Sequence, residues 1–577
     1  MSRGTRSGTP PRDLAGPGDR RLGADAGSGA RRAGRAGLAA TAVSITLTLA
    51  VALAGPSVME PALPGGRGRP GQPPWAFGLH LSPQATVSLA AAALAAGTAG
   101  LGLCLHALRR GWTVSPRIVL AAGLLTATAL ALTPPFGSSD HLSYAAYGRM
   151  VVTGHDPYRT TPAMLARLGD PVGRAVQDWR TSPSVYGSLA TGGQALASWI
   201  GGTSPRLTVF ALSLLGLAAF AATGLLLHAL TGGSRVRQLR AGLIWTLNPL
   251  LLQLLVAGAH VDSQAIVFCA AAIAVFSWGQ AGQGPARFGP AAVAGVFTGL
   301  AFAVKLSFVL VAGGLVVAAL LAWWPRGGPG QVGRPRQPLR TRWGPLVLAA
   351  GGVTAGFLVT AAAAFLPWGV ASLGPALRAG SYVSIGSPWR WVRSGLQLLV
   401  GEASANDLVR AAAIMLAAAL LALFLRPMLS LAGGAGPGSR RGSAGTAAPG
   451  IPAPGPVGLP VLAAGSSFVI GFAWLVAWPY VLPWYDGLAW ALLALLPWAA
   501  LPWAALDWLV LARTAALAFG YLPARGIAMP AGLGWLQSVV RTVVTPAILL
   551  VVTVLLVLVL WPASRGRTVR RAGDPRA

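Results

Sequence analysis

Residues 117–149 read RIVLAAGLLTATALALTPPFGSSDHLSYAAYGR and contain the transition around which the chain is organised. The first half is an apolar run of the length that crosses a bilayer as a helix. The second half opens one of the few polar regions of the chain, and Asp140 lies near its start. A carboxylate is costly in hydrocarbon, so this position at the end of a span indicates a polar cavity and a function.

The composition is that of a protein that crosses the membrane many times. The 577 residues are 54% hydrophobic and 10% charged, and apolar runs of about 18 residues or more recur along the chain. The formal net charge of +30 comes from arginines in an N-terminal arm and short loops. That distribution favours membrane orientation and anionic lipid headgroups over nucleic acid as the reason for the charge. Cys104 and Cys269 lie within apolar runs, so neither a disulfide framework nor a metal cluster is expected.

We expect about fourteen membrane-spanning helices, with the N-terminus in the cytoplasm. Arginines fall on alternate loops, as the positive-inside rule requires, and the basic C-terminus then needs an even number of spans. Thirteen is the alternative, because Arg513 would lie inside a span if 486–522 crosses twice. The expected spans lie near 37–55, 85–108, 117–134, 206–231, 241–258, 263–280, 288–304, 306–324, 344–367, 407–425, 459–479, 486–502, 504–522 and 538–561.

The spans group into two modules on either side of a Gly/Pro/Ala-rich cytoplasmic linker. The expected segments are a disordered basic cytoplasmic arm (1–36), a membrane module (37–426), the linker (427–458), a C-terminal transmembrane module (459–562) and a basic tail (563–577).

The long loops all fall on the outer side in this topology, and the inner loops other than the linker are short. Long structured loops on one side usually mark the side that carries function. We therefore expect amphipathic helices in these loops and an active face outside the plasma membrane. The loops cover 56–84, 135–205 and 368–406.

Asp140, Tyr144 and Tyr147 are spaced i, i+4 and i+7, so on a helix they share one face. A carboxylate at the dry edge of a cavity can act as a general base, because burial raises its basicity. The alternative is that Asp140 caps the helix, since Ser138 and Ser139 precede the same helical stretch. The pattern alone leaves both interpretations open.

Further polar residues interrupt the ends of apolar runs. His260 and Asp262 are two residues apart, which suits a metal or a phosphate-sugar and equally suits a helix cap. Lys305 is the only lysine and interrupts a long apolar run. Its ammonium suits a lipid-linked phosphate, with snorkelling at a helix end as the alternative.

Two aromatic stretches occur in the second half of the chain. Trp389-Arg390-Trp391-Val392-Arg393 has the composition of an interfacial belt or of a sugar-phosphate shelf. In residues 479–486, two prolines break a span and expose aromatic residues, so Trp484 and Tyr485 are expected to line a binding cavity. The chain has no P-loop, no GxGxxG after a strand and no HExxH, which argues against a nucleotide-driven pump.

Several short motifs follow one another along residues 117–500. They are Tyr144-Ala145-Ala146-Tyr147-Gly148, Gly154-His155-Asp156-Pro157-Tyr158, Asp170-Pro171-Val172, Ser182-Pro183-Ser184-Val185-Tyr186-Gly187, Gly258-Ala259-His260-Val261-Asp262, Ala303-Val304-Lys305 and Val481-Leu482-Pro483-Trp484-Tyr485. In this order they resemble the actinobacterial polyprenol-phosphate-mannose-dependent alpha-(1→6)-mannosyltransferases, which have the GT-C fold. Ser139 stands where that family is expected to have arginine, and Val261 where it is expected to have asparagine.

The resemblance implies an all-α, GT-C-like polytopic fold and an inverting transfer of mannose at the outer face. It assigns the general base to Asp140 and the donor phosphate to Lys305, Arg390 and Arg393. The substrate-binding residues that it implies are Tyr144, Tyr147, Asp156, Tyr158, Tyr186, His260, Asp262, Trp484 and Tyr485.

The implied partners are polyprenyl-phosphate mannose as donor, a lipid-linked alpha-1,6-mannan of a lipoglycan core as acceptor, and membrane lipids, with no nucleic acid. No cofactor is identified, and the need for a divalent metal ion stays open. Two other functions remain as alternatives, a transporter or flippase for lipid-linked sugars and a non-catalytic partner in envelope assembly. The scarcity of acids in mid-span counts against the transporter.

Overall fold

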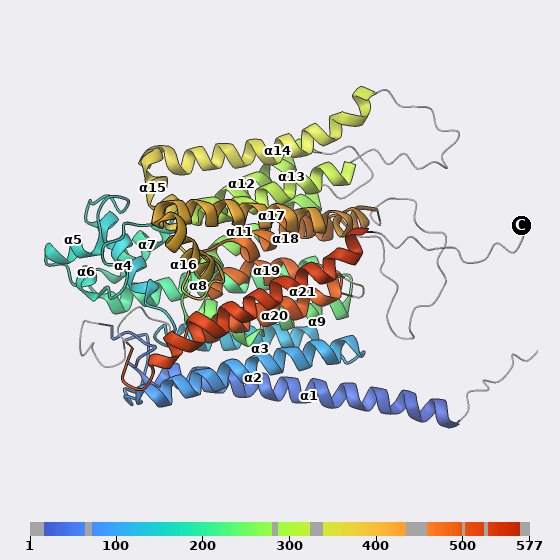
Figure 1. Ribbon diagram of the computed structural model, residues 1–577, viewed down its shortest axis with the longest axis horizontal. Helices are drawn as coiled ribbons and strands as arrows, with labels where there is room; N and C mark the ends of the chain where they lie inside the picture. The colour runs from blue at the N-terminus through green and yellow to red at the C-terminus, as the bar shows by residue number, and fades with distance from the viewer. Residues whose placement is uncertain are drawn as a thin grey trace, which may run out of the picture.

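The computed structural model describes residues 17–63, 72–279, 287–323, 339–433, 458–498, 502–523 and 529–565. Within these residues the regular structure consists of helices, with no strand. Ten helices are long and apolar enough to cross a membrane, and shorter apolar helices cover Pro116–Ala131, Phe288–Val304 and Leu306–Ala322. Figure 1 shows the long helices lying side by side in one bundle. The protein is therefore an all-α multi-pass membrane protein, which confirms the predicted fold class.

Helices of the N-terminal half often begin at a serine followed by proline. Ser82 and Ser204 each accept a hydrogen bond from a backbone N–H of the first turn, and proline occupies the first helical position, where its missing N–H costs nothing. This half contains α1 (Pro17–Ala54), α2 (Pro83–Arg109), α3 (Pro116–Ala131), α4 (Asp140–Val152), α5 (Pro162–Arg167), α6 (Pro171–Ala175), α7 (Ser188–Gly201), α8 (Pro205–Leu230), α9 (Arg235–Ile244), α10 (Pro249–Leu251), the π-helix η1 (Leu252–Ala257) and α11 (Asp262–Gly279).

The second half continues the bundle and adds two short helices, α15 and α16, in the loop after α14. Its elements are α12 (Phe288–Val304), η2 (Leu306–Phe308), α13 (Val309–Trp323), α14 (Leu339–Phe365), η3 (Leu366–Trp368), η4 (Val370–Leu373), α15 (Gly374–Ala379), α16 (Trp389–Val400), α17 (Glu402–Gly433), α18 (Leu459–Ala477), η5 (Pro483–Tyr485), α19 (Asp486–Leu493), α20 (Trp503–Gly520), the π-helix η6 (Leu536–Val544) and α21 (Thr545–Arg565).

The predicted disordered arm differs from the structure over part of its length. α1 begins at Pro17, so the backbone of residues 17–36 is helical and continues into the first span. Residues 1–16, most of the predicted linker (434–457) and most of the predicted tail (566–577) lie outside the described residues.

The region 486–522 turns back on itself, which explains the arginine inside a predicted span. α19 has eight residues, all buried, and runs antiparallel to α20. At one end of the pair, the guanidinium of Arg513 binds the carboxylate of Asp486. At the other end, Arg240 binds both Asp507 and the backbone carbonyl oxygens that follow α19. The buried arginine is therefore neutralised within the bundle, and α18 and α20 run in the same direction.

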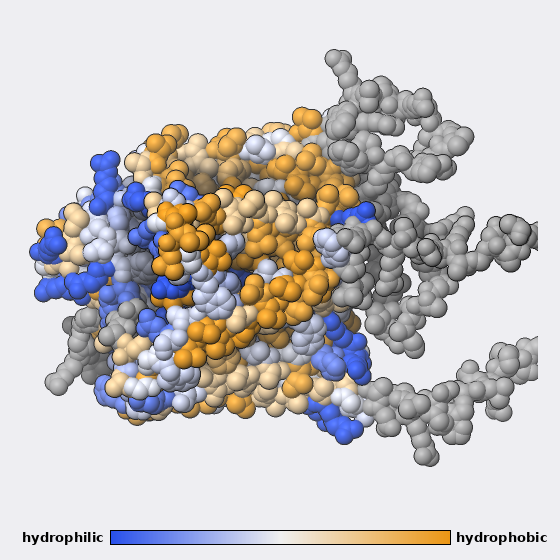
Figure 2. Space-filling model, in the orientation of Figure 1, coloured by the Kyte–Doolittle hydropathy of each residue, from blue (hydrophilic) through white to orange (hydrophobic). Residues whose placement is uncertain are grey.

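The polar helices gather at one end of the bundle. Figure 1 shows α4 to α7 and α15 to α16 at the left end, whereas α1 begins and α21 ends at the right. In Figure 2 hydrophilic residues cover the left end, and the middle of the molecule carries a broad apolar band. The arginine-containing loops after α2 and α8 lie at the right end, opposite α4. The bundle thus has the polarity that the loop lengths predicted.

Candidate active site

A cavity of about 420 Å³ lies at the polar end of the bundle. Its walls come from three parts of the chain that are distant in sequence: α4 with the loop after α6, the loop around α15, and the segments at the outer ends of α18, α20 and η6. A cavity built where several loops converge on a helical scaffold is the usual form of a ligand site. We therefore take this cavity as the candidate active site.

Tyrosine dominates the walls of the cavity. The chain has only eight tyrosines, and seven of them line this one cavity. Phenol rings offer apolar faces to a sugar ring, and their hydroxyl groups both donate and accept hydrogen bonds. The seven are Tyr144, Tyr147, Tyr186, Tyr382, Tyr480, Tyr485 and Tyr521.

The tyrosines near Asp140 contact one another. The rings of Tyr144 and Tyr186 meet edge to face with centroids 5.0 Å apart, and their hydroxyl oxygens are 3.4 Å apart. The hydroxyl of Tyr147 donates a hydrogen bond to the carbonyl oxygen of Ser182. Burial raises the pKa of the Tyr144 and Tyr186 phenols well above the usual value, so both stay protonated. This wall therefore presents neutral hydroxyl groups.

Asp140 is the one carboxylate among the described residues that line the cavity. It is the first residue of α4, and Ser139 takes the N-cap position without a side-chain capping bond. The backbone N–H of Asp140 donates to the hydroxyl of Ser138 at 3.1 Å. The residue is 8% exposed. Asp140 thus reaches into the cavity instead of capping the helix.

The surroundings of Asp140 make it more basic than an ordinary aspartate. Burial raises the pKa of its carboxyl from 3.8 to about 7. The Lys305 ammonium and a hydrogen bond from Trp179 oppose the rise, whereas the carboxylates of Asp178 and Asp262 add to it. A base with a pKa near the working pH combines a large ionised fraction with strong proton affinity.

A layer of paired side chains supports the floor of the cavity. The Lys305 ammonium lies 2.8 Å from Oδ1 of Asp262 and 3.6 Å from the centre of the Tyr485 ring. The His260 ring stacks on Trp484 at 3.6 Å, and its Nδ1 lies 3.8 Å from Oδ2 of Asp140. Lys305, His260 and Asp262 do not line the cavity in this structure. They position Tyr485, Trp484 and Asp140, which do.

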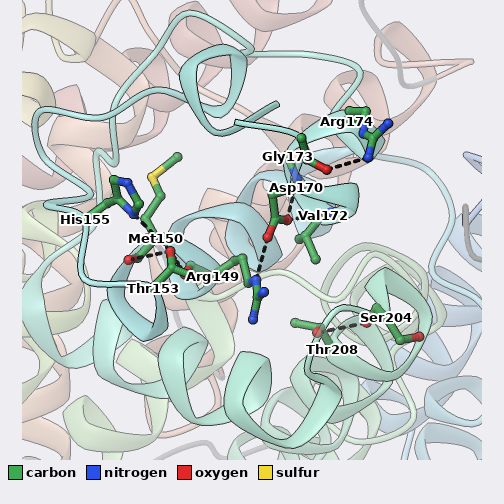
Figure 3. Close-up of polar contacts among 11 residues, drawn as sticks. Arg149, Met150, Thr153, His155, Asp170, Val172, Gly173, Arg174, Ser204 and Thr208 are labelled. Atoms are coloured by element: carbon green, nitrogen blue, oxygen red, sulfur yellow. Dashed lines mark hydrogen bonds and ion pairs between the residues drawn. The ribbon is translucent and has the colours of Figure 1, made fainter. Parts of the chain in front are cut away.

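The polar region that carries Asp140 is held in place at the far end of α4. Figure 3 shows Arg149 and Asp170, whose Nε and Oδ2 are 2.7 Å apart. The other oxygen of Asp170 accepts hydrogen bonds from the N–H groups of Val172 and Gly173, which fixes the start of α6. The Asp170-Pro171-Val172 motif is therefore a helix cap that also holds α4.

α4 packs closely against α7 because Gly148 lies at their crossing. A Cβ atom at this position would lie 2.0 Å from the carbonyl oxygen of Gln194. Gly187 connects the Tyr186 loop to α12. Its backbone N–H donates a hydrogen bond to the carbonyl oxygen of Val304, the residue before Lys305. These two glycines bring the Tyr186 loop and α4 together around the cavity.

Other residues predicted for the site lie elsewhere. Asp156 accepts a hydrogen bond from the N–H of Tyr158, and Tyr158 is buried with its hydroxyl 3.2 Å from that of Thr191. Arg390 is exposed on α16, and Arg393 binds Glu402 and Asn406. The described lining of the cavity includes none of these four. The structure therefore does not bring together the cations predicted for the donor phosphate.

Several residues that line the cavity were not among the predicted site residues: Trp179, Arg378, Tyr382, Tyr480, Tyr521 and Arg541. Trp179 has a positive φ of 58°, which is unusual for a bulky residue and typical of a constrained functional position. One signal was present in the sequence, because Arg541 is a charged residue inside the last apolar run. The scarcity of tyrosine was another.

Among the described residues, no group of three or more His, Cys, Asp or Glu side chains is placed to hold a metal ion.

The bundle and its cavity define a multi-pass membrane protein with a sugar-compatible site at one polar end. Residues 42–322 match the family of alpha-(1->6)-mannopyranosyltransferase N-terminal domains. This part of the chain is therefore similar to that family, in agreement with the resemblance that the motifs predicted.

Two relatives are similar to the chain. Alpha-(1->6)-mannopyranosyltransferase B of Corynebacterium glutamicum is 28% identical over 411 residues, which is 70% of this chain and 62% of the relative. A probable alpha-(1->6)-mannopyranosyltransferase of Mycolicibacterium smegmatis is 32% identical over 148 residues, 24% of this chain and 25% of the relative. The chain thus matches less than two thirds of the length of either relative. No solved structure matches the chain significantly.

Proposed function

We propose that this protein is an alpha-(1→6)-mannosyltransferase that moves mannose from a polyprenyl-phosphate donor to an alpha-1,6-mannan acceptor of a lipoglycan core. The observation that carries the proposal is the cavity, in which one carboxylate of raised pKa faces seven tyrosines at the polar end of a membrane bundle. The family of residues 42–322 and the names of the two relatives support the sugar and the linkage.

In the proposed reaction Asp140 takes the proton of the acceptor hydroxyl as its oxygen attacks the anomeric carbon of mannose. The bond between that carbon and the phosphate oxygen breaks, and the electron pair leaves with the polyprenyl phosphate. The phosphate is a good leaving group, so no second carboxylate is needed to protonate it. A single carboxylate in the described lining supports one displacement with inversion, and an alpha product then requires a beta-linked donor.

The side chains around Asp140 have positioning roles in this scheme. Burial raises the pKa of the Asp140 carboxyl, and the Lys305 ammonium lowers it again in part. As a result, a substantial fraction of the Asp140 carboxyl groups is ionised near pH 7. Trp484 and Tyr485, held by His260 and Lys305, form a wall against which a sugar ring can pack.

We place this site at the outer face of the plasma membrane, with the N-terminus of the chain in the cytoplasm. The arginine-containing loops at the opposite end of the bundle support this orientation through the positive-inside rule. A lipid-linked donor suits that face, because the chain contains no P-loop and no GxGxxG after a strand.

The proposal is tested with purified protein in lipid vesicles, a polyprenyl-phosphate mannose and a short alpha-1,6-mannoside. Wild-type protein is expected to extend the mannoside by an alpha-1,6-linked mannose, and Asp140→Asn to abolish extension without changing insertion. Asp407→Asn is a matched control, because Asp407 is an exposed carboxylate of α17 that pairs with Arg410 outside the cavity. Movement of the lipid across the bilayer without sugar transfer would instead make the protein a flippase. If neither occurs, the assembly-partner alternative gains support.

A further inference from the structure

Two arginines line the cavity together with Asp140. Arg378 comes from α15 and Arg541 from η6, elements more than 150 residues apart in the chain. Among the described residues, neither guanidinium has a carboxylate within ion-pair distance. Two uncompensated cations in one largely apolar cavity indicate an anionic ligand.

Arg541 is held so that part of its guanidinium stays available. Its Nε donates to the carbonyl oxygen of Gly520 at 2.7 Å, and one terminal nitrogen donates to that of Tyr521 at 2.8 Å. The guanidinium carbon lies 5.2 Å from the centre of the Tyr521 ring. These contacts fix the side chain and leave the second terminal nitrogen without a hydrogen bond to the described residues. A guanidinium fixed in this way is suited to a phosphate oxygen.

Of the three cations predicted for this role, Lys305 and Arg393 are paired, and Arg390 is exposed on α16 and does not line the cavity. Lys305 is neutralised by Asp262 at 2.8 Å and lies outside the cavity lining. Arg393 is bound to Glu402 at 2.6 Å. Arg541 also sits on a nine-residue π-helix within a membrane span. π-Helical segments are rare and often occur at functional sites.

Apolar surface lies directly beside these arginines. α16 has no buried residue, and the indole N–H of its Trp391 donates to the carbonyl oxygen of Thr542 on η6. Val539 and Val543 of η6 are 47% and 51% exposed. Figure 2 shows apolar residues over α16 and along α21 next to the polar end. A ligand with an anionic head and a hydrocarbon tail matches this combination.

We propose that Arg378 and Arg541 form the subsite for the phosphate of the lipid-linked donor, with the isoprenoid chain lying along α16 and η6. This inference rests on the proposed function and replaces Lys305, Arg390 and Arg393 as the phosphate-binding cations. During transfer the phosphate changes from a monoanionic diester to a dianionic monoester as it takes the electron pair. The two guanidinium groups stabilise that added charge, so they contribute to the transition state as well as to binding.

The test measures binding of a short-chain polyprenyl phosphate to the full-length protein in nanodiscs, together with mannose transfer. Arg378→Gln and Arg541→Gln are each expected to raise the Kd for polyprenyl phosphate by about ten- to a hundredfold, the effect of losing a charged hydrogen bond. Binding of the uncharged polyprenol is expected to be unchanged in both variants. Arg410→Gln is the matched control, because Arg410 pairs with Asp407 outside the cavity.

The other outcomes separate the two proposals. Arg541→Gln removes a hydrogen bond to the backbone at the end of α20, and this variant could therefore fail to fold. In that case Arg378→Gln is the decisive variant, because the exposed Arg378 side chain makes no such bond to the described residues. Normal polyprenyl phosphate binding in a folded Arg378→Gln, with transfer intact, overturns the subsite and leaves the proposed function standing. Equal binding of inorganic phosphate and polyprenyl phosphate overturns the lipid assignment. Absence of both transfer and lipid binding in wild type contradicts the proposed function itself.

Discussion

The ionisation of Asp140 provides a direct test of the site. As pH rises and the carboxyl ionises, mannose transfer should increase and the stability of the fold should decrease. A general base acts only when ionised, and the pKa of the Asp140 carboxyl lies near 7. The ionised fraction is therefore about one half at pH 7, about one tenth at pH 6 and about nine tenths at pH 8. Transfer under subsaturating donor and acceptor should rise by about ninefold between pH 6 and pH 8. An ordinary aspartate with a pKa of 3.8 would give a flat profile over that range.

Replacement of Asp140 should remove both the activity and its pH dependence. Asp140→Asn keeps the size of the side chain but cannot accept the proton, so transfer should fall by about a hundred- to ten-thousandfold. Any remaining transfer should be independent of pH between 6 and 8. Vesicle assays at fixed protein insertion, buffered across this range, measure both quantities.

The same residue has the opposite effect on stability. The pKa of Asp140 is higher in the folded protein than in an unfolded chain, so ionisation favours unfolding. The destabilisation is absent below about pH 4, grows as pH rises, and is complete above about pH 7, where it reaches at most about 4 kcal/mol. Asp140→Asn should therefore melt at a higher temperature than wild type at pH 8, and the difference should vanish near pH 4. A variant that loses activity and also melts lower at pH 8 would refute this account of Asp140 as a buried, strained base.

Three further perturbations test the framework around the cavity. Lys305→Gln should move the rise of activity to higher pH, because loss of the ammonium raises the pKa of Asp140. Lys305→Gln combined with Asp262→Asn should recover stability and move the rise part of the way back, because the Asp262 carboxylate also raises the pKa of Asp140. Asp507→Asn should destabilise the protein by about 3–5 kcal/mol in thermal unfolding, because it leaves Arg240 buried without its counter-ion; an unchanged melting temperature would contradict this. Gly148→Ala should lower stability by about 1–3 kcal/mol despite alanine's better helix propensity, because the methyl group would overlap the backbone of α7.

The sequence predicted the architecture well because its signals are physical and local. Apolar runs of spanning length became helices in the structure, and the positions of arginines separated the two ends of the bundle. The region 486–502 was harder, because α19 is buried by other helices and needs no spanning length of its own. Arg513 argued against a span here, because the sequence did not show that Asp486, 27 positions earlier, is its counter-ion.

The candidate site was only partly predictable from the sequence. Residues close together in the chain could be placed together, and residues far apart could not. Asp140, Tyr144 and Tyr147 share one helix face, so periodicity alone placed them together. Tyr480, Tyr521 and Arg541 reach the same cavity only through tertiary packing, which no local pattern encodes.

Lys305 shows how little residue type alone says about a role. A lone lysine in an apolar run suggested a phosphate ligand, but the same apolar surroundings require a partner for any buried charge, and Asp262 fills that requirement within the protein. An available cation must instead lie where a polar ligand can compensate it. Arg378 and Arg541 meet that condition because they line the cavity, so we propose that the donor phosphate binds beside them.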